Sequence, residues 1–359
     1  MFKRIYLVSL AASIALVASL AAQQPAAPAP GAAPAGAVIG VGTYIHLVSD
    51  VNNSIPFYSE LLGAMPNGRA NGPTGPREFA PNEVVSSLYG TPGSLFRGGT
   101  IRIAGSEIQG AELSDFQTSD RKRVQPRLQD AGSMTLALVV RDITVAAAAL
   151  AKNGGSIITP KGQPISSETD LGPGKALLGR DPDGFLIGLE QPNKLPETTA
   201  PETSNVIGAS LIVTVADLAK ATSFYKSALG FDVKPAKPLG PDKDLVALAG
   251  LPAAIKSQCA TALIPGTAVR VEFLEITGVD RKALGADAHG VGSSVLRLRV
   301  KDIDQTVASL KANGATVASA NGQPVTFMNG QRMAIVSDAN SIFVQTVQAA
   351  PPQPVRGQP

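Results

Sequence analysis

Two stretches decide how this chain folds: VSDVNNSIPFYSELLG at residues 48–63 and VADLAKATSFYKSALG at residues 215–230. Each has an Asp suited to begin a helix, a helix-length segment with Phe-Tyr at its centre, and a closing Leu-Gly. The paired positions keep a constant offset of 167. Such a correspondence marks an internal repeat, which has to be resolved before any motif is interpreted.

The repeat extends beyond these stretches at an offset of 160. Its matching positions are Glu112, 120–122 and Asp142 in the first half and Glu272, 280–282 and Asp302 in the second. A weaker repeat lies inside each half, because 134–155 and 295–314 again read as strand, Asp and helix. β-rich runs follow each helix, and we expect strands at 84–89 and 245–249 among them. The pattern predicts an α+β fold of four tandem βαβββ modules.

Composition divides the chain into segments. Residues 23–37 and 349–359 are rich in Pro and Ala, and a polar run near the middle has the composition of a linker. Each half is long enough for one core. The predicted organisation is a signal peptide at 1–22, a spacer at 23–37, a first domain at 38–191 with modules 38–116 and 131–191, a linker at 192–205, a second domain at 206–348 with modules 206–278 and 292–348, and a disordered tail at 349–359.

The N-terminus has the pattern of a secretory signal. Lys3 and Arg4 precede an apolar run at 5–20, and small residues follow at 19–22. A retained membrane anchor is the alternative, but a span of roughly 16 apolar residues is short for a bilayer. We therefore expect cleavage, a secreted or periplasmic protein, and no stable membrane span in the mature chain.

Charge and cysteine usage exclude several classes. The 31 basic and 28 acidic residues are interspersed, without the basic stripe that nucleic-acid binding requires. Cys259 is the only cysteine, so no intrachain disulfide can form. The expected partner is a small molecule and not a nucleic acid.

With RDPDGFLIGLEQP at 180–192 and VRVEFLEITGVDRK at 269–282, the two repeated stretches make the chain resemble the vicinal oxygen chelate superfamily. This superfamily includes glyoxalase I, extradiol dioxygenases and bleomycin-resistance proteins. The resemblance implies cup-shaped mixed sheets built from paired modules, with two glyoxalase-like domains. It leaves open how the four modules pair.

The resemblance also locates the positions that hold a metal in many relatives. Here they are Thr43, Glu112, Thr135, Gly188, Ser210, Glu272, Val295 and Gln345. None is His, and each half retains one carboxylate, whereas a divalent transition metal needs three or more donors. We expect no cofactor. A weak divalent site completed by Thr hydroxyls, Gln345 and Glu190 is the alternative.

The two histidines have structural interpretations. Strand alternation turns His46 toward the helices, which predicts a packed core side chain. His289 lies in a Gly-rich loop before the fourth module and is predicted to be a solvated loop residue.

The same alternation predicts which side chains face into the cups. Arg297 and Arg299 are expected opposite Glu272, in a surface suited to a carboxylate or phosphate. Alternatively, Arg297 pairs with Glu272 and Arg299 reaches solvent. The other candidate ligand-binding residues are Arg270, Ser210, Gln345, Thr43, Thr135 and Glu190, and the candidate catalytic bases are Glu112 and Glu272.

Two connections also carry predictions. The charged triplets 120–122 and 280–282 are expected to salt-link successive modules. The Gly/Pro-rich segment 67–82 has no equal in the second half and is predicted to be either a lid or a mobile connection.

The sequence supports three functional hypotheses. The leading hypothesis is an exported, monomeric, metal-independent protein that binds a small anionic or aromatic molecule. The second is a metal-dependent lyase, isomerase or dioxygenase of the glyoxalase type. The third is a non-catalytic structural module, which predicts cups filled by side chains.

Overall fold

Asp50 and Asp217 begin equivalent helices in the computed structural model, which describes residues 37–64, 76–118, 120–169 and 171–351. The Asp50 carboxylate accepts from the backbone N–H of Asn52 and starts α1 (Val51–Leu62). Gly63 ends this helix at a left-handed φ of 63°, where a side chain would be strained. The same caps bound α4 (Leu218–Leu229), as the repeated stretches predicted.

The remaining helices follow the repeat as well. They are α2 (Glu83–Leu88), α3 (Ile143–Leu150), α5 (Lys243–Ala249) and α6 (Ile303–Ala312), with short 3₁₀ turns at Pro160–Gly162 and Ala320–Gly322. The prediction of strands at 84–89 and 245–249 is wrong, because these residues form α2 and α5. The side chains of Asn82 and Asp242 accept hydrogen bonds from the first turn of each helix.

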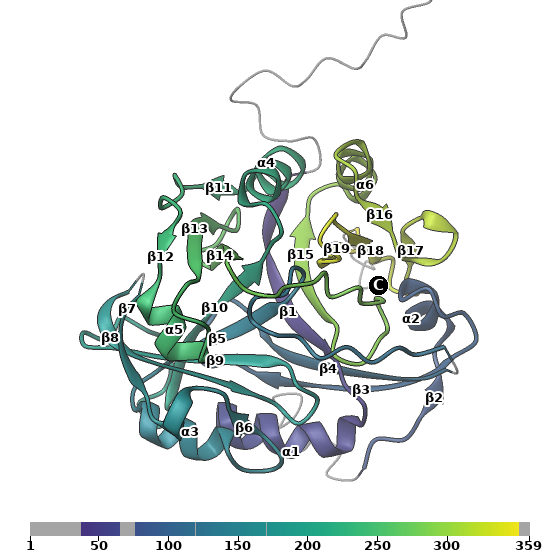
Figure 1. The fold of residues 1–359 in the computed structure, drawn as a ribbon. Helices are drawn as coiled ribbons and strands as arrows, with labels where there is room; N and C mark the ends of the chain where they lie inside the picture. Colours follow the sequence, from purple (N-terminus) through teal and green to yellow (C-terminus); the bar gives the residue numbers. More distant parts are fainter. Residues whose placement is uncertain (1–36, 65–75, 119, 170, 352–359) are drawn as a thin grey trace, which may run out of the picture. The chain divides into compact units, whose positions relative to one another are not determined.

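Two mixed sheets contain the strands of the described residues (Figure 1). The first runs in the order β16 (Thr316–Val317), β18 (Arg332–Ser337), β19 (Phe343–Gln348), β15 (Ser294–Val300), β1 (Val38–Leu47), β4 (Gly110–Gln117), β3 (Leu95–Arg102) and β2 (Ala80–Pro81), with β17 (Val325–Thr326) beside β18. The second runs in the order β11 (Asp232–Val233), β13 (Lys256–Leu263), β14 (Arg270–Thr277), β10 (Val206–Thr214), β5 (Met134–Val140), β9 (Leu186–Pro192), β8 (Gly172–Arg180) and β6 (Ser156–Ile157), with β7 (Ile165–Thr169) and β12 (Gly240–Pro241) at its margins.

The strand order settles how the modules pair. β1 of the first module lies antiparallel to β15 of the fourth, with Ile45 opposite Val295. β5 of the second module lies antiparallel to β10 of the third, with Thr135 opposite Ile212. Modules one and four therefore form one cup, here called the outer-module cup, and modules two and three form the inner-module cup. Each cup takes strands from both halves of the chain.

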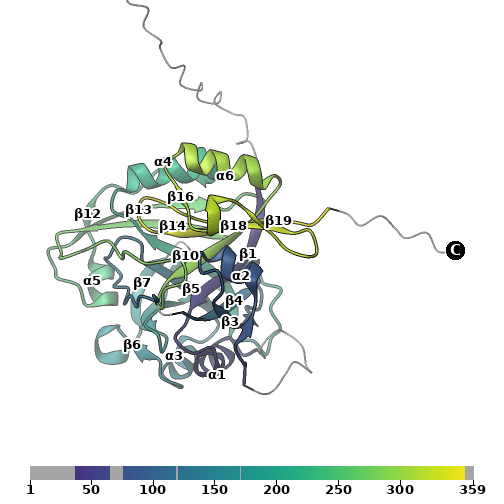
Figure 2. The ribbon, with the colours of Figure 1, turned by 90° about the vertical axis from the view of Figure 1, so that its right-hand side faces the viewer.

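The helices pair differently from the strands. α1 contacts α3 within the first half, and α4 contacts α6 within the second. Figures 1 and 2 show these pairs on opposite sides of the sheets. One apolar core, containing residues from Val38 to Val344, joins all four helices to the backs of both sheets. The apolar core is therefore continuous between the two halves of the chain.

His46 lies in this core, as predicted. Its ring is fully buried and contacts the rings of Tyr44, Tyr58 and Phe185. Burial lowers the pKa of His46 to about 3, because a charged imidazole there would lose its water. His289 lies in a loop as predicted, but the prediction that it is solvated is wrong: its side chain is only 13% exposed, with Nε2 3.6 Å from Asp120 Oδ1.

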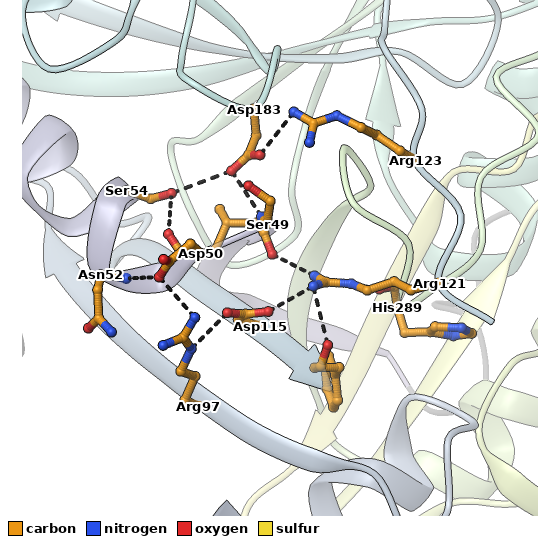
Figure 3. A network of polar contacts seen from close by, with 12 residues as sticks. Ser49, Asp50, Asn52, Ser54, Arg97, Asp115, Arg121, Arg123, Asp183 and His289 are labelled. Carbon is orange, nitrogen blue, oxygen red and sulfur yellow. Dashed lines mark hydrogen bonds and ion pairs between the residues drawn. The ribbon is translucent and has the colours of Figure 1, made fainter. Parts of the chain in front are cut away.

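A polar network ties the start of α1 to neighbouring strands and loops (Figure 3). Asp115 on β4 accepts from Arg97 on one side and from Arg121 on the other, at 2.8 and 2.7 Å. Arg97 also donates to Asp50, and Arg121 donates to the carbonyl of Val48. Arg121 therefore ties the connection after the first module back to that module, and it also donates to the carbonyl of His289, so the predicted salt link between successive modules stays a prediction.

A tyrosine–aspartate pair links the two modules inside each half. The Tyr58 hydroxyl on α1 donates to Asp181, which follows β8, at 2.9 Å. Its counterpart, from Tyr225 on α4 to Asp338, is longer at 3.5 Å. We call these two pairs the module latches.

Several predictions fall on residues that the structure does not describe. These are the signal peptide at 1–22, residues 23–36 of the spacer predicted at 23–37, most of the tail and the 67–75 part of the proposed lid. In the described part of the chain, no helix is both long and apolar enough to cross a membrane.

Candidate functional site

An ion pair occupies the outer-module cup. Arg297 Nη1 and Nη2 donate to the two Glu112 carboxylate oxygens at 2.7 and 2.9 Å. Thr43 Oγ1 donates to the same carboxylate at 2.9 Å, and Arg297 Nε donates to Gln345 Oε1. About a fifth of the Arg297 and Glu112 side chains is exposed. This parallel, two-point geometry fixes both side chains across the cup.

A close backbone approach makes room for Arg297. A Cβ on Gly42 would lie 2.7 Å from Arg297 Cδ, so β1 needs a glycine where the arginine crosses it.

Apolar side chains fill the rest of the outer-module cup. Leu88 and Tyr89, at the end of α2, pack with Phe116, Ile335 and Phe343 from the sheet. Burial raises the pKa of Tyr89 far above its ordinary value, and the nearby Glu112 carboxylate acts in the same direction. The interior of this cup is therefore occupied by its own side chains.

The predicted pairing of Arg297 and Arg299 with Glu272 is wrong. Glu272 belongs to the other sheet, while Arg297 is bonded to Glu112 and Arg299 is exposed. Strand parity was predicted correctly, because Leu296 and Leu298 are buried behind the sheet. The error came from the cup assignment: β15 lies beside β1, not within a sheet made by the second half alone.

The inner-module cup contains a cavity of about 350 Å³. Its floor carries Ser210 on β10, Arg270 and Glu272 on β14, and Glu190 on β9. Cys259 on β13 also lines it. Four of the predicted site residues are thus brought together from two modules: Ser210, Arg270, Glu272 and Glu190.

α5 and its flanking segments border the cavity opposite the floor, with Leu245 and Leu248 among the lining residues. Asp244 Oδ2 accepts from Ser167 Oγ at 3.3 Å and from the backbone N–H of Glu168 at 3.2 Å, which ties α5 of module three to β7 of module two. Asp242 caps α5 and accepts from Ser257 Oγ at 2.5 Å.

Sequence reasoning missed the part of the cavity made by α5, β7 and residues 237–242. The usable signal was an Asx cap at 82 and 242 with a glycine eight residues later in both modules, at 90 and 250. The other candidates lie elsewhere. Thr135 is buried in the inner-module sheet, whereas Thr43 and Gln345 belong to the outer-module cup.

The metal positions of the family do not fit a transition metal in either cup. In the outer-module cup, Arg297 already places a cation on both Glu112 oxygens, and Val295 has no donor atom. The inner-module set has one carboxylate, Glu272, two hydroxyls and Gly188. Across the described residues, no group of three His, Cys, Asp or Glu side chains is arranged to hold a metal.

Comparison with known proteins now identifies the family. The model of the Glyoxalase/Bleomycin resistance protein/Dioxygenase superfamily matches residues 40–189 and 208–342. The chain belongs to this superfamily. A search of curated proteins finds no match.

Solved structures share the fold at low sequence identity. Glyoxalase I from Zea mays is 17% identical, with a TM-score of 0.55, covering 87% of this chain and 92% of that one. A putative dioxygenase from Bacillus subtilis subsp. subtilis str. 168 is 11% identical, with a TM-score of 0.51, covering 89% and 87%. At these identities the likeness concerns the fold alone.

Proposed function

We propose that this chain is an exported protein that binds a small organic molecule in the inner-module cup without a resident metal. One observation carries the proposal: the inner-module cup holds a cavity of about 350 Å³ where the outer-module cup is filled by its own side chains. A concave site of this size, with a few convergent polar groups, is the usual form of a small-molecule site.

The expected anionic character of the ligand depended on Arg297 and Arg299, which do not line this cavity. Aromatic recognition by stacking has no support either, since no aromatic side chain is among the cavity-lining residues of the described chain. The ligand is therefore better defined by what does line the cavity.

A catalytic function is the second candidate, and one observation favours it. Glu272 is half-buried and faces the cavity together with Arg270. A carboxylate in such a place suits proton abstraction beside a carbonyl group, with the guanidinium offsetting the charge that develops. A purely structural role accounts for the outer-module cup and leaves the inner cavity unexplained.

Export and a monomeric state belong to the same proposal. Export rests on the sequence pattern of residues 1–22. A monomer is supported by the pairing of modules, because a single chain supplies both partners of each cup.

A ligand screen with a matched blocking variant tests the binding function. Ser257 lines the cavity, and its counterpart on β3 is Phe96, which packs against the apolar filling of the outer-module cup. We expect hits from a thermal-shift screen on the wild-type chain to be lost in Ser257→Phe and kept in Ser257→Ala. Hits that bind Ser257→Phe equally well would refute binding at this site.

Metal analysis tests the proposal that the protein has no resident metal. The chain is incubated with Zn, Mn, Fe and Ni, dialysed and analysed for metal. We expect less than stoichiometric retention of each ion, because neither cup supplies three suitable donors. A stoichiometric metal would restore a glyoxalase-type or dioxygenase-type enzyme as the first hypothesis.

A further inference from the structure

Acidic residues outnumber basic residues both on the floor and at the rim of the inner-module cavity. On the floor, two carboxylates, Glu190 and Glu272, accompany one cation, Arg270. At the rim, Glu168, Asp242 and Asp244 accompany Lys237. The lining thus has five acidic against two basic residues, a formal charge of −3. A concave surface of one sign concentrates the field and attracts the opposite charge.

The apolar part of the lining comes from α5 and from the sheet beside the floor carboxylates. Leu245 and Leu248 come from α5, and Ile212 and Leu274 come from the sheet. All four belong to one apolar cluster inside the inner-module cup. The cavity therefore has an aliphatic wall beside a carboxylate floor.

We propose that the ligand is an amphipathic organic cation: an ammonium or similar nitrogen group on an aliphatic body. This inference rests on the proposed binding function and specifies its ligand class. The cationic group lies over the floor, where Glu190 and Glu272 come from two different modules. The aliphatic body contacts Leu245 and Leu248.

Comparison with the outer-module cup supports the assignment. There the carboxylate equivalent to Glu272 is Glu112, and Arg297 neutralises it from β15. The position equivalent to Arg297 in the inner-module cup is Ala137. Arg270, whose counterpart is Gly110, is the basic residue on this floor beside the two carboxylates. The two cups thus differ in the formal charge of their linings, and that of the inner-module cavity is negative.

Three probes of one size and different charge test the proposal on the full-length chain: cyclohexylmethylamine, cyclohexylmethanol and cyclohexanecarboxylate. Isothermal titration calorimetry gives each affinity at low and high salt. We expect the amine to bind about tenfold more tightly than the alcohol, because a unit charge near a half-buried carboxylate contributes on this scale. The carboxylate should bind most weakly, and the preference for the amine should fall with added salt.

Charge variants locate the effect. Glu190→Gln and Glu272→Gln should each reduce the preference for the amine several-fold, and Arg270→Gln should increase it. Glu202→Gln is the matched control, since it makes the same change of net charge at an exposed residue outside the cavity.

An amine that binds no better than the alcohol or the carboxylate would overturn the cationic assignment, and so would a series in which no probe binds. A preference unchanged in Glu190→Gln and Glu272→Gln would overturn it as well. The binding function itself falls only if the separate ligand screen fails, so the two outcomes can be distinguished.

Discussion

The two cups have the same frame and opposite contents. Both have a half-buried glutamate on the strand beside the central pair, Glu112 in one and Glu272 in the other. The outer-module cup adds large side chains where the inner-module cup has small ones. The equivalent pairs are Arg297 and Ala137, Gln345 and Gly188, and Tyr89 and Ala249. A few side-chain volumes therefore decide whether this frame encloses a ligand cavity or a packed interior.

The module latches offer a second comparison and the largest expected effect. Burial raises the pKa of Asp181 to about 7, and burial also raises the pKa of Asp338. A folded-state pKa above the unfolded value means that stability is fully present below about pH 4 and is lost as the pH rises toward 7. The unfolding free energy of the wild type minus that of Asp181→Asn should fall by on the order of 4 kcal/mol between about pH 4 and about pH 7.

His46→Phe is a control of opposite sign for this measurement. Because the pKa of His46 is lowered to about 3, its contribution is lost as the pH falls from about 6.5 toward 3. Urea unfolding of the wild type and the two variants at a series of pH values measures the contributions of Asp181 and His46 to stability. No change of slope in Asp181→Asn would show that Asp181 is ionised in the folded chain throughout.

The ion pair inside the outer-module cup gives the next largest effect. Arg297→Met leaves Glu112 half-buried without its cation, and we expect a loss of about 3 kcal/mol in unfolding free energy. The matched Arg270→Met, beside an open cavity, should cost under about 1 kcal/mol. Arg297→Met combined with Glu112→Leu should recover most of the loss. Equal costs at 297 and 270 would refute the contrast between a filled and an open cup.

Removing the latch hydroxyls tests the difference in their distances. Tyr58→Phe leaves the buried Asp181 with one bond fewer and should cost about 1.5 kcal/mol. Tyr225→Phe breaks a bond of 3.5 Å and should cost about 0.5 kcal/mol. Thermal unfolding of the two variants ranks them, and the reverse order would contradict the geometry.

The smallest effect concerns the rim of the inner-module cavity. Asp244→Ala removes two exposed hydrogen bonds between α5 and β7, and we expect a loss of about 0.5 kcal/mol. Dissociation of a cavity ligand should become faster while the outer-module cup is unaffected. Stopped-flow displacement measures the rate, and an unchanged rate would show that this contact does not restrict ligand exit.

The sequence predicted the fold well because its signals are local. Asp50, Gly63 and their repeats fix the helix ends, and strand alternation predicts buried Leu296 and Leu298 correctly. Membership in the superfamily is confirmed by the match over both halves.

The candidate site was only partly predictable, because its composition depends on which strands meet. Arg297 was assigned to Glu272 from chain proximity, whereas pairing across the halves gives it to Glu112. The prediction of strands in place of α2 and α5 is wrong because β-branched Val84, Val85 and Val246 favour β structure, and tertiary packing with the Asx caps outweighs that preference.

The pairing of β1 with β15 has a consequence for the order of folding. Val38 meets Val300, so 262 residues separate these neighbours, whereas Val140 and Val206, which join the inner-module cup, are 66 residues apart. Long loops close slowly, because their entropy is lost before their contacts form. The inner-module cup is therefore expected to form before β1 and β15 pair. As a result β1, the first strand in the sequence, is among the last to join its sheet.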